Sequence, residues 1–173
     1  ASEPLERAAA GPKAVVLADR LGHVTWHDGK KAVRIDPEHG GALTALAISA
    51  DGDAIATAGS DRAVRLFGAD GQAVGPVRER GLGVVTALAF AGRALLAGTE
   101  DGEVALIDLE DRRVMARFAA HEGPVDQVVP VPGGLATAGR DRVVRRYRGT
   151  LPQPRGALDP RLVASGRGVA LAA

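Results

Sequence analysis

One turn motif recurs along this chain at a fixed interval and sets the strongest limit on its fold. Asp61, Asp101 and Asp141 stand forty residues apart, and each follows small residues and precedes an alternating apolar run. The same spacing relates four valines, namely Val24, Val64, Val104 and Val144. Four sequence units in one register indicate a repeat architecture, in which each unit buries its apolar face against its neighbours.

The stretch from residue 44 to residue 67 shows one unit most fully. Leu46 and Ile48 alternate with small residues, and an Asp-Gly pair at 51–52 marks a turn. An apolar run at residues 55–58 and a second turn lead into a third alternating run. Such alternation bounded by turn residues predicts three short antiparallel strands. We expect this three-stranded sheet in each full copy of the unit, at residues 44–67, 84–107 and 124–147.

The units resemble WD40 repeats, a family whose units close with small residues, Asp, alternating Val and then Trp-Asp. Residues 57–67 and 137–147 match this closing pattern, and the resemblance extends over residues 14–150. It implies an all-β, WD40-type β-propeller with about four blade units. Because rings of this family usually contain more blades, we expect the chain to be part of a larger ring. Another chain, a second copy or further residues would complete it.

The same resemblance implies that two units carry a hydrogen-bonded set of four side chains. In the family this set is a His before the first strand, a Ser or Thr in the second, an Asp in the turn and a Trp in the third. The matching residues are His39, Thr57, Asp61 and Phe67 in one unit, and His121, Thr137, Asp141 and Tyr147 in the other. Phe67 has no N–H donor, so we expect the end of its network to be lost or filled by water.

The unit between these two departs from the pattern. No His precedes Val84, and Ala97 stands forty residues after Thr57. Ile107 stands at the Trp place, so this unit lacks the hydrogen-bonded set, and we expect it to be held by apolar packing.

His, Asp and Thr also compose catalytic triads, so these residues permit an active-site interpretation. We favour a structural role, because in such a repeat the Asp fixes a turn and the His ties the entry of the blade to it. The sequence shows no HExxH motif, phosphate-binding loop or evident nucleophile–base pair. We therefore expect a non-enzymatic protein with no catalytic residues.

His23 and His27 flank the chain's single Trp and are candidates for metal ligands. Residues four apart on a strand lie about 13 Å from each other, so one strand does not bring them together. We therefore expect them to be outward or interfacial strand residues, and we expect no metal site in this chain.

A cluster of arginines begins near the end of the last full unit. Eight arginines face two aspartates between residues 140 and 167. The candidate partner-binding residues are Arg140, Arg142, Arg145, Arg146 and Arg148. Local charge of this kind can bind nucleic acid, an acidic protein or lipid headgroups. Since Tyr147 is the one aromatic residue among them, stacking of single-stranded nucleic acid is disfavoured, and we favour a protein partner or a solvated rim.

The two ends of the chain differ from the repeats. Residues 1–13 are polar and Ala-rich, and we interpret them as a flexible leader, with a short helix at 4–10 as the alternative. Residues 151–160 contain three prolines and are interpreted as a linker. Residues 161–173 are interpreted either as a degenerate strand pair or as a short helix that begins at Asp159-Pro160.

In its helical form, the stretch 159–173 resembles the entry helix of small bacterial c-type cytochrome domains, which leads into a Cys-x-x-Cys-His haem site. The chain contains no cysteine, so this resemblance implies haem in an associated domain and no cofactor here. The absence of cysteine also excludes disulfides, thiol catalysis and zinc–thiolate sites within these residues.

Composition gives few further limits. The formal net charge of +1 names no partner, and no apolar run approaches the roughly 18 residues of a membrane span. The first residues, Ala-Ser-Glu-Pro, suit the mature end of an exported protein and equally a boundary within a longer one. We favour the bacterial periplasm over the cytoplasm.

Two functions are consistent with these observations. The first is a non-enzymatic WD40-like scaffold for protein interactions, within a larger assembly or a longer polypeptide. The second is the propeller portion of an exported c-type cytochrome electron-transfer protein, with its haem domain outside these residues. Partners of the first kind are another protein, further blades or a second copy of the chain, and nucleic acid is disfavoured.

Overall fold

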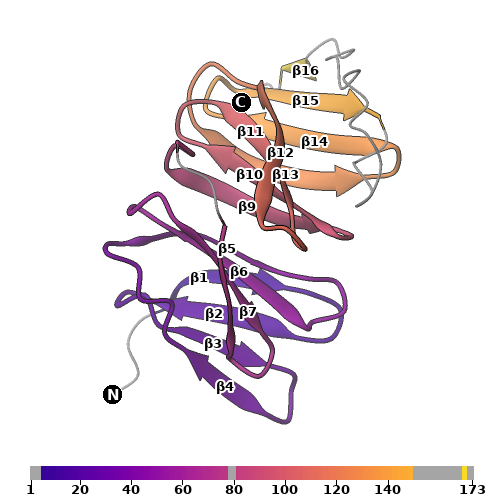
Figure 1. Cartoon of the computed structure of the whole chain (residues 1–173). Coiled ribbons are helices and arrows are strands. Elements are labelled where there is room, and N and C mark those ends of the chain that lie inside the picture. Colours follow the sequence, from indigo (N-terminus) through magenta and orange to yellow (C-terminus); the bar gives the residue numbers. More distant parts are fainter. Residues whose placement is uncertain (1–4, 78–80, 150–168, 171–173) are drawn as a thin grey trace.

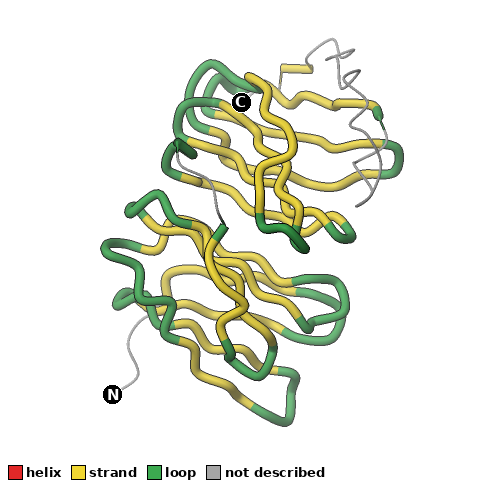
Figure 2. Tube along the Cα trace, in the orientation of Figure 1, coloured by secondary structure: helices red, strands yellow, loops and turns green. Residues whose placement is uncertain are grey.

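The computed structural model describes residues 5–77, 81–149 and 169–170 of the chain. These residues form sixteen β-strands and no helix, as the tube in Figure 2 shows. The strands assemble into four antiparallel sheets of four strands each. The described residues accordingly contain no helix that could span a membrane.

Each sheet consists of four strands that are consecutive in number, and neighbours in sequence are hydrogen-bonded neighbours in the sheet (Figure 1). The first sheet contains β1 (Leu5–Ala10), β2 (Val15–Asp19), β3 (Val24–His27) and β4 (Ala32–Ile35). The second contains β5 (Leu43–Ile48), β6 (Ala54–Gly59), β7 (Val64–Gly68) and β8 (Ala73–Pro76). The third contains β9 (Val85–Ala91), β10 (Ala94–Thr99), β11 (Glu103–Asp108) and β12 (Arg113–Ala119). The fourth contains β13 (Val125–Val131), β14 (Gly134–Gly139), β15 (Val143–Arg148) and β16 (Val169–Ala170).

The three-stranded units expected from the forty-residue period are confirmed as β5–β7, β9–β11 and β13–β15. Asp61, Asp101 and Asp141 lie in equivalent turns, each between the second and third strands of a sheet. The residue after each aspartate has a left-handed backbone, with φ of 62° at Arg62 and Arg142 and 84° at Gly102, the third such position. This conformation reverses the chain tightly enough for the third strand to pair with the second.

The four sheets stack in sequence order, and apolar side chains fill the junctions between them. Val16, Trp26, Ile55 and Phe67 are buried between the first and second sheets. Ala56, Leu66, Leu95 and Ile107 are buried between the second and third. Leu96, Leu106, Leu135 and Tyr147 are buried between the third and fourth. The core is thus divided into three layers, one for each junction between consecutive sheets.

The first and fourth sheets lie at opposite ends of this stack, the indigo end and the orange end in Figure 1. In the part of the chain that the structure describes, no cluster of buried apolar residues joins these two sheets. The innermost strands β1, β5, β9 and β13 line a common groove of about 510 Å³. Four sheets around a common groove are arranged as the blades of a propeller, which confirms the predicted all-β fold with four blades.

All four innermost strands share one irregularity in their pairing. The register of each strand with its neighbour shifts by one residue near its start. The residues skipped by these shifts are Glu6, Thr44, Thr86 and Asp126. Such bulges bend a strand locally, and here they occur at equivalent places along the groove.

The expectation of a flexible leader through residue 13, or of a short helix at residues 4–10, is wrong for residues 5–10. These residues form β1, which pairs with β2 and is the innermost strand of the first sheet. A turn closed by the Gly11 N–H donating to the Ala14 carbonyl at 2.9 Å joins the two strands. The Ala-rich sequence has weak strand propensity, so the pairing with β2 rather than local preference decides its conformation.

The expected linker at residues 151–160 lies outside the described residues, as does most of the stretch 161–173. Within that stretch the structure places Val169 and Ala170 in β16, opposite Val144 and Val143 of β15. A helix through the whole stretch, on which the cytochrome resemblance depended, does not agree with this strand.

Candidate functional site

The first candidate site lies at the start of the second sheet, around His39. Its Nδ1 lies 2.9 Å from Oδ1 of Asp61, and its Nε2 lies 2.9 Å from Oγ1 of Thr57. Because the carboxylate only accepts, Nδ1 carries the proton and Nε2 accepts from the Thr57 hydroxyl. Asp61 also accepts from the backbone N–H groups of Gly40 and Ala63, at 3.1 and 3.2 Å. The aspartate therefore joins the turn to the segment that enters the sheet.

The fourth sheet repeats this arrangement around His121. Nδ1 of His121 lies 2.8 Å from Oδ1 of Asp141, and Nε2 lies 2.7 Å from Oγ1 of Thr137. The backbone N–H groups of Val143 and Glu122 donate to the same carboxylate at 3.1 and 3.4 Å. Corresponding His, Thr and Asp residues thus hold the same hydrogen bonds in two sheets.

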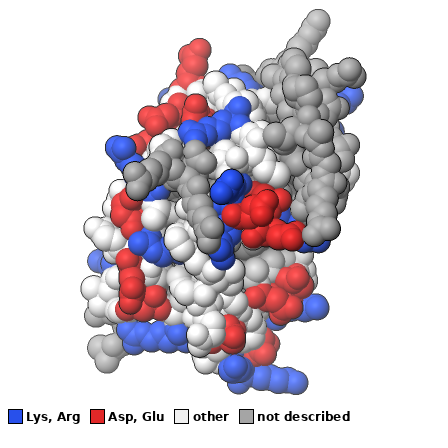
Figure 3. Space-filling view, viewed as in Figure 1, with Lys and Arg blue, Asp and Glu red and all other residues white. Residues whose placement is uncertain are grey.

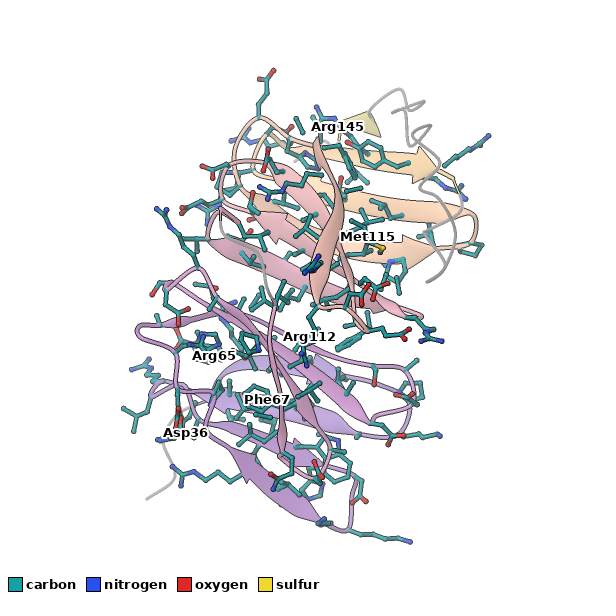
Figure 4. The ribbon with its side chains drawn as sticks, viewed as in Figure 1. Asp36, Arg65, Phe67, Arg112, Met115 and Arg145 are labelled. Atoms are coloured by element: carbon teal, nitrogen blue, oxygen red, sulfur yellow. The ribbon has the colours of Figure 1, made fainter. Side chains whose placement is uncertain are left out.

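An arginine that the sequence analysis did not place in these clusters belongs to each of them. Arg65 donates from Nη1 to Oδ2 of Asp61 at 2.8 Å, and Arg145 donates to Oδ2 of Asp141 at 2.6 Å. Figure 4 shows the two arginines in their separate sheets. Both follow the aspartate by four residues, so the sequence contained a signal for them. The prediction of Arg145 as a partner-binding residue now competes with this internal ion pair.

The electrostatics of the two clusters follow from these contacts. Burial alone would raise the pKa of Asp61, but hydrogen bonds from His39 and Arg65 hold that pKa well below its usual range. Burial alone would also raise the pKa of Asp141. Hydrogen bonds from Arg145 and His121 outweigh that effect and hold this pKa well below its usual range. Burial lowers the pKa of His39, and Asp61 only partly offsets that effect. Both carboxylates are therefore anions at neutral pH, and His39 is neutral.

The place of the family's Trp is filled differently in the two clusters. Phe67 is buried with Ile55 and Trp26 in the first junction and offers no polar atom. Tyr147 is 3% exposed, and its hydroxyl donates to the backbone carbonyl of Ala120 at 3.2 Å. Burial raises the pKa of this phenol. The Tyr147 hydroxyl thus contributes a bond between sheets that Phe67 lacks.

These clusters are poorly placed for chemistry on a substrate. The hydroxyls that would act as nucleophiles belong to Thr57 and Thr137, which are 0% and 2% exposed. Each histidine nitrogen already has a partner within the protein. A nucleophile must touch its substrate, so this arrangement fixes turns and does not present a reactive group.

The candidate metal ligands His23 and His27 make separate local contacts. His23 Nδ1 lies 3.0 Å from Oδ2 of Asp19, and His27 Nδ1 accepts from the backbone N–H of Gly29 at 2.8 Å. Within residues 5–77 and 81–149, no three His, Cys, Asp or Glu side chains are grouped closely enough to hold a metal ion.

The five candidate arginines have different surroundings. Arg145 is held by Asp141, whereas Arg140 makes an exposed contact of 3.4 Å with Asp126. Arg146 donates from Nη2 to the backbone carbonyl of Pro132 at 3.1 Å, and Arg142 and Arg148 are exposed. The face seen in Figure 3 carries interspersed basic and acidic side chains and no large patch of one sign. Arg140, Arg145 and Arg146 thus have three different partners within the protein.

Comparisons with known proteins agree with this architecture. The family described as WD domain, G-beta repeat matches residues 30–68, which include β5 to β7 and the His39 cluster. The fold is that of a WD40-type β-propeller. The crystal structure of the computationally designed Ika4 protein superposes on this WD40-type fold with a TM-score of 0.72 at 18% sequence identity. The match covers 87% of this chain and 94% of that one, and no curated protein sequence matches the chain.

Proposed function

We propose that this WD40-type propeller is a non-enzymatic scaffold that holds a protein partner. The observation that supports this most is the burial of its best-formed polar clusters. His39 and His121, the side chains that most resemble catalytic groups, are bonded within the fold. Charged side chains on turns, among them Arg140 and Arg142, remain available to other molecules.

The turn between β14 and β15 is the proposed contact region for the partner. It presents Arg140 and Arg142 on either side of Asp141, whose charge is already matched by Arg145. Arg140 is 73% exposed at its side chain, so its contact with Asp126 is worth little and is open to exchange. The turn therefore offers cationic groups to an acidic protein surface, which would be drawn to it by charge.

Affinity capture with matched charge variants tests the proposal. The variant R140E/R142E reverses the charge of the proposed contact, and K30E/K31E reverses an equal charge on the exposed turn between β3 and β4. We expect the wild type and K30E/K31E to retain an acidic protein partner, and R140E/R142E to lose it. Raising the salt concentration should weaken capture by the wild type. Equal recovery by all three proteins would contradict the assignment of the turn.

A further inference from the structure

The two end sheets each leave uncovered a face whose counterpart is buried inside the stack. Val15 of β2 is 37% exposed, whereas Ile55, forty residues later in the second sheet, is 0% exposed. Val129 of β13 is 46% exposed, whereas Ala47, at the matching place of β5, is 5% exposed. The difference arises because, among the described strands, the second sheet has a neighbouring sheet on both faces and each end sheet has a neighbour on one face only.

The outer face of the fourth sheet has the residue pattern of a buried junction. Ala136, Ala138 and Val144 lie on the same face as Val129, opposite the face that packs on the third sheet. Eighty residues earlier, the second sheet has Ala56, Ala58 and Val64, which are 0%, 0% and 2% exposed against the third sheet. The fourth sheet thus repeats most of a surface that another sheet covers elsewhere in this molecule, with Arg146 in place of the buried Leu66.

The outer face of the first sheet supplies the matching half of such a junction. Ala10, Val15 and Leu17 project from it, with Ala10 paired to Val15 in the register of β1 and β2. Leu17 occupies the position of Thr57 in the second sheet, and its side chain is apolar. The His cluster is absent from this face, so an apolar contact of the kind found between the second and third sheets suits it.

Side-chain hydrogen bonds join the innermost strands across two existing junctions, and a further junction could contain the same kind of bond. Nε of Arg7 in β1 donates to the backbone carbonyl of Leu43 in β5 at 3.1 Å. Oγ1 of Thr86 in β9 donates to the carbonyl of Val125 in β13 at 2.5 Å. Each bond joins the start of one innermost strand to the start of the next. At the open end the exposed Gln127 of β13 stands at this level, with an amide group able to donate in the same way.

We propose that a second copy of this chain covers both end faces. The fourth sheet of each copy packs on the first sheet of the other, so two copies close into one ring around the groove lined by the innermost strands. A second copy is the favoured occupant because one chain carries both complementary faces, and a pair of chains then leaves none of the four end faces uncovered. The inference deepens the scaffold function by naming one of the partners that the chain holds.

Sedimentation velocity of the full chain, with three matched Val→Asp variants, tests this ring. V15D places a carboxylate on the outer face of the first sheet, and V129D places one on that of the fourth. V74D is the control, because Val74 is 52% exposed on β8 and lies away from both end faces. All three valines are exposed in the single chain, so each variant is expected to fold, which the fluorescence of the buried Trp26 reports independently.

The wild type and V74D are expected to sediment as dimers of twice the 17.7 kDa chain mass. V15D and V129D are each expected to weaken the dimer by at least about 100-fold, because either change buries an unpaired carboxylate in both junctions. A mixture of V15D and V129D retains one unaltered junction and should form a mixed dimer of intermediate affinity. That result distinguishes packing of unlike faces from packing of like faces.

Several results would overturn the ring. A wild type that stays monomeric at about 100 μM, a range that covers even weak specific association, would do so. Dimers that survive both V15D and V129D would place the contact elsewhere, and loss of the dimer in V129D alone would indicate that like faces pair. The capture experiment with R140E/R142E reports separately on the scaffold function. A monomer that still loses its partner in that variant would refute the ring and keep the scaffold.

Discussion

The third and fourth sheets have the same strand order, and their first three strands have equal lengths, yet different chemistry holds them. In the third sheet, Leu95, Ala97 and Ile107 face the second sheet and are each 0% exposed. In the fourth, the equivalent region contains the bonded pair His121 and Thr137. The third sheet is therefore joined to the second mainly by apolar packing, with a hydrogen bond from Nη1 of Arg112 to the Val74 carbonyl at 2.6 Å. The fourth sheet adds a buried polar network to its packing on the third.

The difference shows that the polar network is an addition to the blade and not a condition for it. The third sheet forms its turn at Asp101 without a His, because Gly102 adopts the left-handed conformation at little cost. In the fourth sheet Arg142 occupies that position at φ 62°, which disfavours a non-glycine residue. The hydrogen bonds from His121 and Arg145 to Asp141 offset that cost.

The largest expected effect is a cavity in the apolar junction of the third sheet. Leu95→Ala removes a side chain that is 0% exposed between the second and third sheets, and should lower the free energy of unfolding by about 2–5 kcal/mol. Urea unfolding followed by circular dichroism measures it. Leu21→Ala, at a residue 66% exposed, is the control and should change stability by no more than about 0.5 kcal/mol. Equal effects of the two changes would refute the apolar account.

The next effect is the loss of the polar network in the fourth sheet. His121→Ala leaves Thr137 and Asp141 without their shared partner and should lower the free energy of unfolding by about 1–3 kcal/mol. His39→Ala should act alike in the second sheet. Partner capture by folded His39→Ala should be unchanged, because its partners Thr57 and Asp61 lie in the second sheet, away from the proposed contact turn. A variant that keeps its melting temperature and loses an activity would reverse the structural assignment.

The contribution of the polar networks can also be measured from the dependence of the free energy of unfolding on pH. The pKa of Asp61, Asp141 and His39 is lower in the folded protein than in the unfolded chain, so the unfolded chain binds more protons. Stability should therefore decline below about pH 6.5 as unfolded His39 takes up a proton, and more steeply below about pH 4 as the aspartates do.

Urea unfolding across this pH range measures the slope of stability against pH. Asp141→Asn should remove at most about one proton from that slope below pH 4, or about 1.4 kcal/mol per pH unit. Asp101→Asn, in the equivalent turn of the third sheet, lacks a His partner and serves as the control. An unchanged slope in Asp141→Asn would show that the carboxylate is not coupled to folding.

The smallest expected effect concerns the aromatic position, where the second and fourth sheets differ. Tyr147→Phe converts the fourth sheet to the residue of the second and removes the bond to the Ala120 carbonyl. The free energy of unfolding should fall by about 0.5–1.5 kcal/mol. Phe118, whose ring centroid lies 4.7 Å from that of Tyr147, should keep its contact, so the effect is assigned to the hydroxyl. A larger loss would mean that the ring itself had moved.

The repeat period was sufficient to predict most of the fold. Strands β5–β7, β9–β11 and β13–β15 follow from alternation and turn residues, because these features act locally and recur in register. Strand β1 could not be predicted in the same way. Its Ala-rich sequence becomes a strand only through pairing with β2, and pairing partners are not visible in a single segment.

Part of the candidate site was likewise readable from residue spacing. The sequence indicated which His, Thr and Asp correspond, and the structure brings each set into hydrogen-bond contact. Arg145 was assigned to the arginine-rich group at residues 140–167, and Arg65 was given no role. Their position four residues after the aspartate, in the two units with a His and in neither of the others, was the available signal. The inter-strand bond from Thr86 depends on a bulge and had no such signal.

The consecutive order of the strands has a consequence for how this molecule folds and unfolds. Because hydrogen-bonded strands are neighbours in sequence, with one stretch outside the description before β16, most pairings close short loops at small entropic cost. Each sheet then gains cooperativity only from the sheet beside it, as in a one-dimensional lattice. In a single chain, amide hydrogen exchange should be fastest in the terminal sheets and slowest in the two middle ones, and a lost terminal sheet would leave the remaining ones assembled.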